Sequence, residues 1–298
     1  MITVFTPTYN RGKLLWRVFE SLDKQTSKDF VWLIIDDGSV DNTRDIVADI
    51  RKKADFEIIY LYQKNGGKHR AFNLAVKKCK TDYFLILDSD DILVKDAMEI
   101  LSEKCLLINN NENICGIIGN RGNISGTEII GVKIPDVKVA SGLELYQKMN
   151  FKGDTLRVYK KMILEQYPFP EINGENFIPE NVVFDKIDKK YKMLVINEVL
   201  YLSEYQEDGL TKNINLIKTR NPIGYALSLR SMADTALTLK KKIGGVLLYI
   251  LWTRKFHVKD SFKDFRNKFL YILCIPISYI MEIFHIPRFL FDMFRKVE

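Results

Sequence analysis

The sequence predicts an α/β fold in which helices flank a mostly parallel sheet, followed by a helical, amphipathic C-terminal extension. In the first hundred residues, apolar runs of strand length alternate with segments of helical periodicity. This alternation is typical of a parallel sheet with crossover helices. Beyond Pro222 no further strand is expected, and from Lys240 onward twelve Lys or Arg against five acids account for the whole net charge of +7. We therefore expect one unit over 1–215 and a basic helical tail over 216–298.

Four strands and three helices are expected in the first hundred residues. The strands are the apolar runs 2–6, 31–35, 57–62 and 83–87, and the helices between them lie at about 12–25, 42–53 and 68–79. A polar stretch follows each strand, in the order TPTYNR, DDGSVDNT, KNGGKHR and DSDD. Because the carboxyl ends of parallel strands meet at one edge of a sheet, where ligands bind, we expect all four stretches to meet there.

The next hundred residues predict a second set of elements. These are a helix over 95–108, one or two strands over 114–134, a short helix near 180–190 and a strand near 193–202. Ser141, with Glu144 three residues later, has the form of a capping box and predicts a helix start. Pro222 is placed to open the first helix of the tail, and we expect the boundary near 215–222.

Composition and cysteine spacing exclude several classes of protein. With 298 residues, 47% hydrophobic and 28% charged, the chain can bury the core of one large or two modest domains. The four cysteines and three histidines are too scattered for a disulfide framework or a zinc site. The N-terminal stretch MITVFTPTYN lacks the features of a secretory signal, so a reducing, cytoplasmic location is expected.

The stretch FLILDSDDILV places three carboxylates within four residues at the end of a buried strand. Asp88, Asp90 and Asp91 would repel one another there and resist desolvation. One interpretation is that Asp90 or Asp91 caps the following helix. The other is that Asp88 and Asp90 hold a divalent cation, Mn²⁺ or Mg²⁺, which is shared with a diphosphate.

The stretch NGGK, which ends at Lys68, offers close backbone approach and a positive charge near these acids. It lacks the Gly-x-x-x-x-Gly-Lys-Ser/Thr spacing of a phosphate-binding loop, which disfavours a nucleotidase of that type. The motifs VFTPTYNR, LIIDDGSVDNT, KNGGKHRAFNLAV and YFLILDSDDIL stand in this order. Together they resemble glycosyltransferase family 2, the inverting enzymes with a GT-A fold, of the bacterial polysaccharide type. The resemblance covers about residues 2–205.

The resemblance implies a role for each matching position. It implies that 1–100 is a nucleotide-binding half and 101–215 an acceptor half. The residues implied for donor binding are Thr6, Pro7, Thr8, Tyr9, Arg11, Asp37, Lys68 and Asp88, and those implied for the metal are Asp90 and Asp88. Within this set, Asp37 is expected at the base, Lys68 beside the phosphates and Asp90 as the direct metal ligand. Asp36 would support its loop, and Asp91 would stand behind the site.

The general base is the position where this chain departs from the family pattern. An inverting transfer needs a carboxylate that accepts the proton of the acceptor hydroxyl. The family's Glu-Asp pair is absent, and NGENFIPENVVFDKIDKKYKML stands in its place. Alignment on the downstream KKYKML puts Glu180 at the base position, with Glu175 as the alternative. The family's Arg-x-His is also missing, and Glu204 and Gln206 stand there, which puts a third metal contact in doubt.

The tail combines apolar and basic residues. Its longest uncharged apolar run, Phe269 to Met281, is shorter than the about 20 residues of a spanning helix. Aromatic and aliphatic residues flanked by Lys and Arg, here and over 283–296, suit helices lying in a membrane interface. The alternative is a helical hairpin that packs on the catalytic unit or on a second copy in a homo-oligomer. Apolar residues interrupt the basic ones too often for a nucleic-acid surface.

These observations predict one function and leave two alternatives. We expect an inverting glycosyltransferase of hexosyl or N-acetylhexosaminyl type at the inner face of the plasma membrane. It would move a sugar from a nucleoside-diphosphate sugar, with UDP as the nucleotide, to a hydroxyl of a glycan or lipid-linked acceptor. The alternatives are a nucleotidyltransferase that makes activated sugars and a non-catalytic nucleotide-sugar-binding module. A haloacid-type phosphatase is disfavoured, because its Asp-x-Asp follows the first strand, not the fourth.

Overall fold

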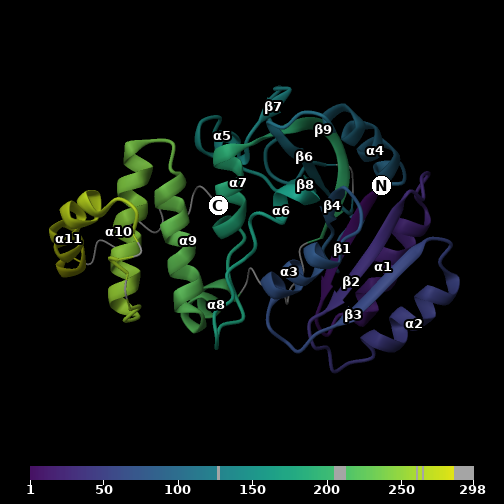
Figure 1. Ribbon diagram of the computed structural model, residues 1–298, viewed down its shortest axis with the longest axis horizontal. Helices are drawn as coiled ribbons and strands as arrows, with labels where there is room; N and C mark the ends of the chain where they lie inside the picture. Colours follow the sequence, from purple (N-terminus) through teal and green to yellow (C-terminus); the bar gives the residue numbers. More distant parts are fainter. Residues whose placement is uncertain (126–127, 205–212, 260, 264, 285–298) are drawn as a thin grey trace.

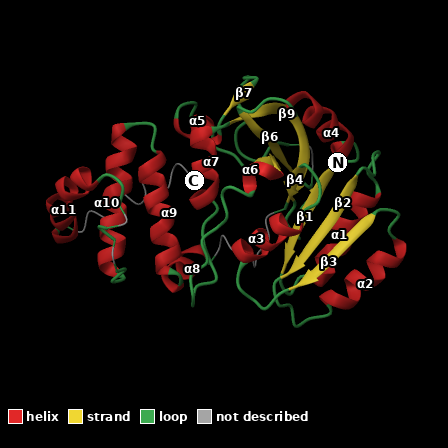
Figure 2. Ribbon diagram, in the orientation of Figure 1, coloured by secondary structure: helices red, strands yellow, loops and turns green. Residues whose placement is uncertain are grey.

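The computed structural model describes residues 1–298 except 126–127, 205–212, 260, 264 and 285–298. A twisted sheet is covered by helices on both faces, and three further helices are stacked outward from one side (Figure 1). Figure 2 shows the same arrangement by secondary structure, with the strands gathered on the right and helices alone on the left.

The sheet contains the nine strands found in the described part of the chain. They are β1 Ile2–Thr8, β2 Phe30–Asp36, β3 Glu57–Tyr62, β4 Tyr83–Ile86, β5 Ile92–Leu93, β6 Ile114–Asn123, β7 Val139–Ala140, β8 Thr155–Lys160 and β9 Lys192–Ser203. Their order is β3-β2-β1-β4-β8-β6-β9-β5, and β7 pairs with β9. Six strands, β1 to β4 with β6 and β9, point the same way. The predicted α/β fold with a mostly parallel sheet is confirmed.

The helices follow the predicted positions closely in the first half of the chain. They are α1 Gly12–Asp23, α2 Thr43–Lys53, α3 Lys68–Lys78, α4 Ala97–Ile108, α5 Gly142–Gln147, α6 Lys161–Leu164, α7 Asn181–Lys190, α8 Ile214–Arg220, α9 Pro222–Thr235, α10 Leu239–Lys255 and α11 Lys268–Ile283. The capping box at Ser141 is confirmed, with both of its hydrogen bonds present. Pro222 occupies the first turn of α9, as predicted.

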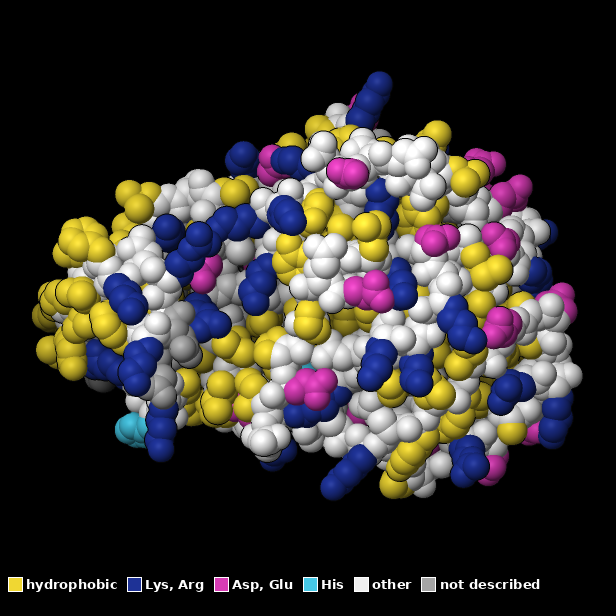
Figure 3. Space-filling view, in the orientation of Figure 1, with side chains coloured by type: hydrophobic (Ala, Val, Ile, Leu, Met, Phe, Trp, Pro, Cys, Tyr) yellow, Lys and Arg dark blue, Asp and Glu magenta, His cyan; other side chains and the backbone are white. Residues whose placement is uncertain are grey.

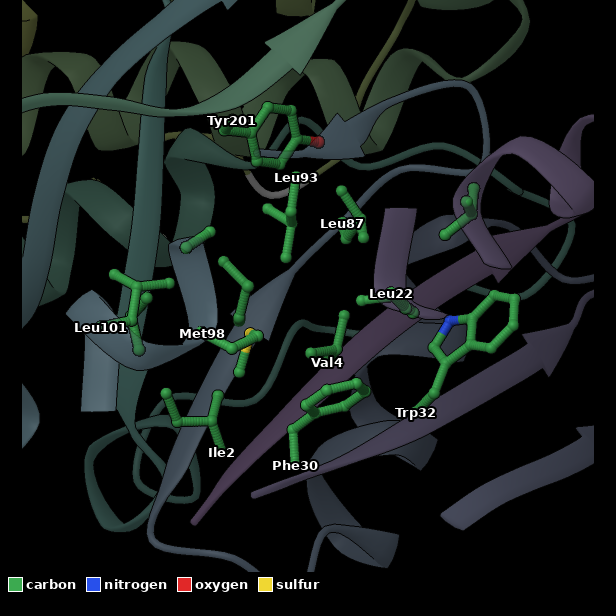
Figure 4. Packing of buried hydrophobic residues seen from close by; sticks show 14 of the residues in the cluster. Ile2, Val4, Leu22, Phe30, Trp32, Leu87, Leu93, Met98, Leu101 and Tyr201 are labelled. Carbon is green, nitrogen blue, oxygen red and sulfur yellow. The ribbon is translucent and has the colours of Figure 1, made fainter. Parts of the chain in front are cut away.

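Two hydrophobic clusters hold the helices on the two faces of the sheet. Side chains alternate along each strand, so Phe30 and Trp32 of β2 face α1, α2 and α4, whereas Leu33 faces α3 and α7. Figure 4 shows the first cluster, where Val4, Leu22 and Trp32 meet residues of α4 and β9. Full burial of a Leu- or Phe-sized side chain contributes about 1.5–3 kcal/mol, so these faces fix the strand register.

The sequence did not predict β5, β7 and β8. The two-residue strands β5 and β7 have too few residues to show a period, and both are defined by pairing with β9. The strand β8 runs antiparallel between β4 and β6, and its sequence TLRVYK alternates only weakly. Its insertion separates the parallel first half of the sheet from the mixed second half.

The three C-terminal helices form a separate apolar cluster. Tyr225 of α9, Trp252 of α10 and Tyr271 of α11 lie in it. The ring centroids of Tyr225 and Trp252 are 4.5 Å apart in an edge-to-face arrangement. Of the helices in the described part of the chain, none has the length and apolar character to cross a membrane.

Candidate active site

The four polar stretches meet at one edge of the sheet, as predicted. In the register of β1, β2 and β3, Thr8 lies beside Asp36 and Asp36 beside Tyr62, so three strand ends are level. The stretch after β4 joins them, because its Leu87 N–H donates to the Phe5 carbonyl of β1. The crossovers α1, α2 and α3 therefore return each loop to the same edge.

Lys68 links the first acid of the DSDD stretch to the predicted base. Its Nζ lies 2.7 Å from Oδ1 of Asp88 and 2.9 Å from Oε1 of Glu180. Burial alone would lower the pKa of Lys68, but the two carboxylates outweigh it and raise that pKa. Burial alone would raise the pKa of Asp88. The charges of Lys68 and Arg121 outweigh burial, so this pKa lies below its usual value. The arrangement holds Asp88 and Lys68 in their charged forms at neutral pH.

Asp90 is held by two arginines of the first loop and helix. Arg11 NH1 donates to Oδ2 of Asp90 at 2.7 Å, and NH2 of Arg17 donates to the Asp90 carbonyl. Arg17 also pairs with Glu204 at 2.6 Å, which places Glu204 beside this group. Gln206, the other residue at the family's Arg-x-His positions, lies outside the described residues.

Asp91 is buried behind the site and does not cap a helix. The following helix, α4, has Asp96 at its N-cap. The Tyr201 hydroxyl donates to Oδ2 of Asp91 at 2.7 Å and accepts from the Asp88 N–H at 3.1 Å. Arg121 stacks over the Tyr201 ring and lies 3.7 Å from Oδ2 of Asp91. Burial, and next the charge of Asp88, raise the pKa of Asp91 to about 6.

The protein therefore supplies its own positive charge to the acidic stretch. Lys68, Arg11 and Arg121 each face one of the three carboxylates. A divalent cation held by Asp88 and Asp90 would therefore not be the sole counter-charge, because cationic side chains from α3, the β1–α1 loop and β6 already face these acids. The sequence contains no local signal for Arg121 or Tyr201. Tyr201 lies 110 residues from Asp91, and Arg121 lies on β6, whereas its two partners lie on β9 and in the loop after β4.

Asp36 and Asp37 both hold loops in place. Asp36 accepts from the Tyr60 hydroxyl at 2.6 Å and the Ser39 N–H at 2.8 Å. Both oxygens of Asp37 accept from the β3–α3 loop, including the N–H groups of Gly66 and Gly67 at 2.9 and 2.8 Å. The loop-supporting role expected of Asp36 is thus shared by Asp37, whose predicted contact with a base remains a prediction.

Of the residues at the end of β1 that were expected to bind the donor, only some are accessible to solvent. Thr6 is fully buried and accepts a hydrogen bond from the Trp32 indole at 2.9 Å, so its side chain belongs to the core. Thr8 is also buried, and its hydroxyl has no partner among the described residues. Pro7 is partly exposed and Tyr9 is 48% exposed, so Tyr9 is not a packed core aromatic. Pro7 and Tyr9 are the accessible side chains at this strand end.

Glu175, the alternative base, has a structural role. It is 5% exposed, and its two oxygens accept the N–H groups of Ile223 and Gly224 at 2.8 and 2.6 Å. These N–H groups belong to the first turn of α9 and have no hydrogen-bond partner within the helix. A carboxylate at this end of a helix is favourable. Glu180 instead has a side chain 53% exposed at the N-cap of α7. The geometry therefore distinguishes the two candidates that the sequence left open.

Gly67 brings the loop of Lys68 close to the chain that carries Glu180. Its φ is +96°, and a Cβ there would lie 1.8 Å from the Asn176 carbonyl oxygen. The close backbone approach expected of the two glycines is thus to another part of the protein. A side chain at 67 would push α3 away from the 176–180 segment.

The donor set at the acidic stretch fits a hard divalent cation. Asp88 and Asp90 are partly exposed, and within the described residues no hydrogen bond reaches Oδ2 of Asp88 or Oδ1 of Asp90. No group of three or more His, Cys, Asp or Glu side chains that could hold a metal ion occurs in the described part of the chain. Such a pair of carboxylates suits Mg²⁺ or Mn²⁺ when substrate phosphates and water complete the coordination.

Comparison with known proteins agrees with this geometry. The family model described as Glycosyl transferase family 2 matches residues 3–167. The glycosyltransferase GlyG of Streptococcus pneumoniae is 30% identical over 218 residues, which cover 68% of this chain and 70% of GlyG. The GalNAc(5)-diNAcBac-PP-undecaprenol beta-1,3-glucosyltransferase of Campylobacter jejuni is 26% identical over 251 residues, covering 80% of this chain and 76% of that enzyme.

A solved structure of similar fold is that of S. aureus TarS 1–349 in complex with UDP-GlcNAc. It aligns with a TM-score of 0.63 at 18% identity, covering 93% of this chain and 80% of the TarS chain. At this identity the likeness concerns the fold alone, and it extends into the C-terminal helices.

Proposed function

Because the chain belongs to glycosyltransferase family 2 and is a glycosyltransferase with a GT-A fold, we propose that it is an inverting enzyme that takes its sugar from a nucleoside-diphosphate sugar, with UDP as the nucleotide. The observation that carries the proposal is the bridge Asp88–Lys68–Glu180. It places the exposed carboxylate of Glu180 next to Lys68 and Asp88, the two residues that would face a diphosphate. A sugar transferred between them would meet its base on one side and its leaving group on the other.

Glu180 is proposed as the general base. It would accept the proton of the acceptor hydroxyl while that oxygen forms the new bond to the anomeric carbon. The bond from the anomeric carbon to the diphosphate breaks on the opposite face, which inverts the configuration. Lys68 would then leave Glu180 for the developing charge on the diphosphate, so one cation would serve both the resting and the reacting state.

The proposed donor site consists of the accessible groups at the strand ends. Pro7 and Tyr9 would lie against the base and ribose, with Thr8 behind them, and Arg11 and Lys68 would face the phosphates. Asp37 would support donor binding by holding the loop of Gly66 and Gly67 in place. Thr6 would support it by packing in the core beneath the strand end. Binding energy at these groups positions the anomeric carbon against the acceptor hydroxyl.

Asp90 and Asp88 are proposed to hold Mn²⁺ or Mg²⁺. When bound, such an ion neutralises charge on the diphosphate and so favours its departure. Asp91 would help to keep Asp88 in place, since Tyr201 connects it to the Asp88 backbone.

The acceptor is proposed to be a glycan on a lipid carrier at the inner face of the plasma membrane. The Campylobacter relative is named for a diphosphate-undecaprenol acceptor. In this chain α11 exposes an apolar surface, with Phe269 at 74%, Ile272 at 53% and Ile283 at 72% exposure. We propose that 1–215 is the catalytic unit and that the tail, 216–298, lies on the membrane surface. Residues 285–298 of the expected interface segments lie outside the described residues.

A panel of nucleotide sugars tests the proposed donor. We expect UDP-sugars to raise the melting temperature more with Mn²⁺ than without it, and GDP- and CMP-sugars to have little effect, because binding to the folded state alone stabilises it. At a ligand concentration 100-fold above Kd the stabilisation is about 2.7 kcal/mol. The measurement is a thermal melt with each sugar, with and without Mn²⁺. Stabilisation by a GDP-sugar alone would overturn the choice of UDP, and no response to any nucleotide sugar would overturn the donor class.

Substitutions on α11 test the membrane proposal in the full chain. Phe269→Glu with Ile283→Glu is expected to reduce binding to anionic vesicles at least about tenfold, because each adds a charge to a surface that would enter the interface. Leu106→Glu, at a 78% exposed position on α4, is the control and should bind as the wild type does. Vesicle co-sedimentation measures all three. Equal binding by the α11 variant would assign the apolar face to protein packing.

A further inference from the structure

A basic groove lies between the proposed catalytic unit and the C-terminal helices, and none of the described residues that line it belongs to the proposed donor site. It consists of two adjoining cavities of about 650 and 490 Å³ that share Lys189, Asp234 and Arg266. Its walls come from the Tyr167–Pro170 loop, α7, α9, the start of α10 and the start of α11. Figure 3 shows Lys and Arg gathered over α9 and α10, beside the apolar end of the molecule formed by α11.

The charge on the groove is strongly one-sided. The described residues that line it include seven cationic side chains and one acidic one, Asp234: the cations are Lys186, Lys189, Lys190, Arg230, Lys242, Arg266 and Lys268. Partial burial, and next the charge of Arg230, lower the pKa of Lys186. Like charges gathered in a concave surface repel one another and attract an anion, because the low-dielectric walls focus their field.

The start of α11 adds to this field. Arg266, Asn267 and Lys268 line the second cavity, and Asn267 caps the helix by accepting from the Leu270 N–H at 3.0 Å. The positive end of the α11 dipole therefore faces the same space as the side chains. Beyond this point one face of α11 is apolar and exposed, with Phe269, Ile272 and Leu273 at its start. A ligand with an anionic group and an adjoining apolar chain would satisfy both surfaces.

The groove also begins close to the proposed base. On α7 the lining begins at Val182, two residues beyond Glu180, and ends at Lys190. At 1.5 Å per residue, Lys186 lies about 9 Å from Glu180 along the helix axis and Lys190 about 15 Å. An anion in the groove would thus be separated from the reacting hydroxyl by the length of a short saccharide. This separation distinguishes it from the donor diphosphate, which would lie between Lys68 and Asp88.

We propose that this groove binds the phosphate groups of a lipid-linked acceptor and positions its terminal sugar at Glu180. The inference rests on the proposed function and specifies its acceptor side. The phosphates would pair with cations of α7 and the start of α11. The lipid chain would leave along the apolar face of α11, and the saccharide would run along α7 towards its N-terminus.

Binding of geranyl diphosphate to the full chain tests the proposal. It is measured by calorimetry without metal, alongside UDP binding with Mn²⁺. Lys186→Gln with Arg266→Gln should weaken geranyl diphosphate binding about tenfold or more, the effect of losing one charge-assisted hydrogen bond, and leave UDP binding unchanged. Lys68→Gln should do the reverse. Lys24→Gln with Lys78→Gln removes the same charge from exposed positions at the C-terminal ends of α1 and α3 and should change neither.

A second pair on the opposite wall, Lys242→Gln with Lys268→Gln, repeats the test if the first pair unfolds. Unchanged geranyl diphosphate binding in a folded groove variant would overturn the proposal. So would a variant that binds geranyl diphosphate normally but loses binding to phosphatidylglycerol vesicles, since the groove would then serve membrane headgroups. If the wild type binds geranyl diphosphate but no nucleotide sugar, the proposed function fails and the groove stands as an anion site.

Discussion

Glu180→Gln is expected to reduce sugar transfer by about 10²–10⁴-fold while leaving UDP binding unchanged. A general base contributes about this much to a rate, and glutamine has the size of glutamate without its ability to accept a proton. Lys68 keeps its ion pair with Asp88 in the variant, so the donor side of the site is preserved. The measurements are the turnover of a UDP-sugar with its acceptor and the melting temperature with UDP.

Glu175→Gln is the matched control for that substitution. Glu175 lies five residues upstream and caps α9, so its loss should lower stability by about 1–2 kcal/mol and leave the transfer rate within a few-fold. Turnover retained in Glu180→Gln would overturn the base assignment. A selective loss of turnover in Glu175→Gln, with its fold intact, would transfer the role to Glu175.

Asp90→Asn is expected to abolish the part of UDP binding that depends on Mn²⁺, weakening it by at least about a hundredfold. Substitution of a residue that only supports a metal ligand typically lowers metal affinity about 10–100-fold. Asp90 is proposed to bind the ion directly, and asparagine would offer it a neutral oxygen in place of a charged carboxylate. The Arg11 guanidinium loses its 2.7 Å partner and can face the phosphates directly, so weak metal-independent binding should persist. Calorimetry of UDP with and without Mn²⁺ separates the two contributions.

Asp96→Asn is the control for Asp90→Asn. Asp96 is exposed at the start of α4 and makes no side-chain cap hydrogen bond. It should bind UDP as the wild type does, with the same dependence on Mn²⁺. An undiminished Mn²⁺ effect in Asp90→Asn would mean that the ion, if bound, is held by other residues.

Much of the first half of the fold could be predicted because its signals are local. The strand at Val31 and the helix at Lys68 each have an apolar pattern, a start and a stop within about a dozen residues. Once such units alternate, chirality and sheet geometry leave one edge for the four loops. The family motifs coincide with these loops, so the site was located with them.

The C-terminal half was harder because its decisive contacts are long-range. The strand β8 owes its antiparallel place to partners on both sides, β4 and β6. The buried group of Asp91, Tyr201 and Arg121 brings together β6, β9 and the loop after β4. No periodicity within any one of those segments encodes that meeting.

The amino-acid order alone determined the class of fold, the edge of the sheet where the four polar loops meet and the family, since each follows from patterns only a few residues long. Tertiary packing decided the surroundings of the two glutamates, because the distant helix α9 buries Glu175 at its first turn, whereas Glu180 stays half exposed beside Lys68. It also decided how the three aspartates coexist, since their counter-charges arrive from separate elements. Charge balance depends on distance in space, and local sequence does not contain that distance.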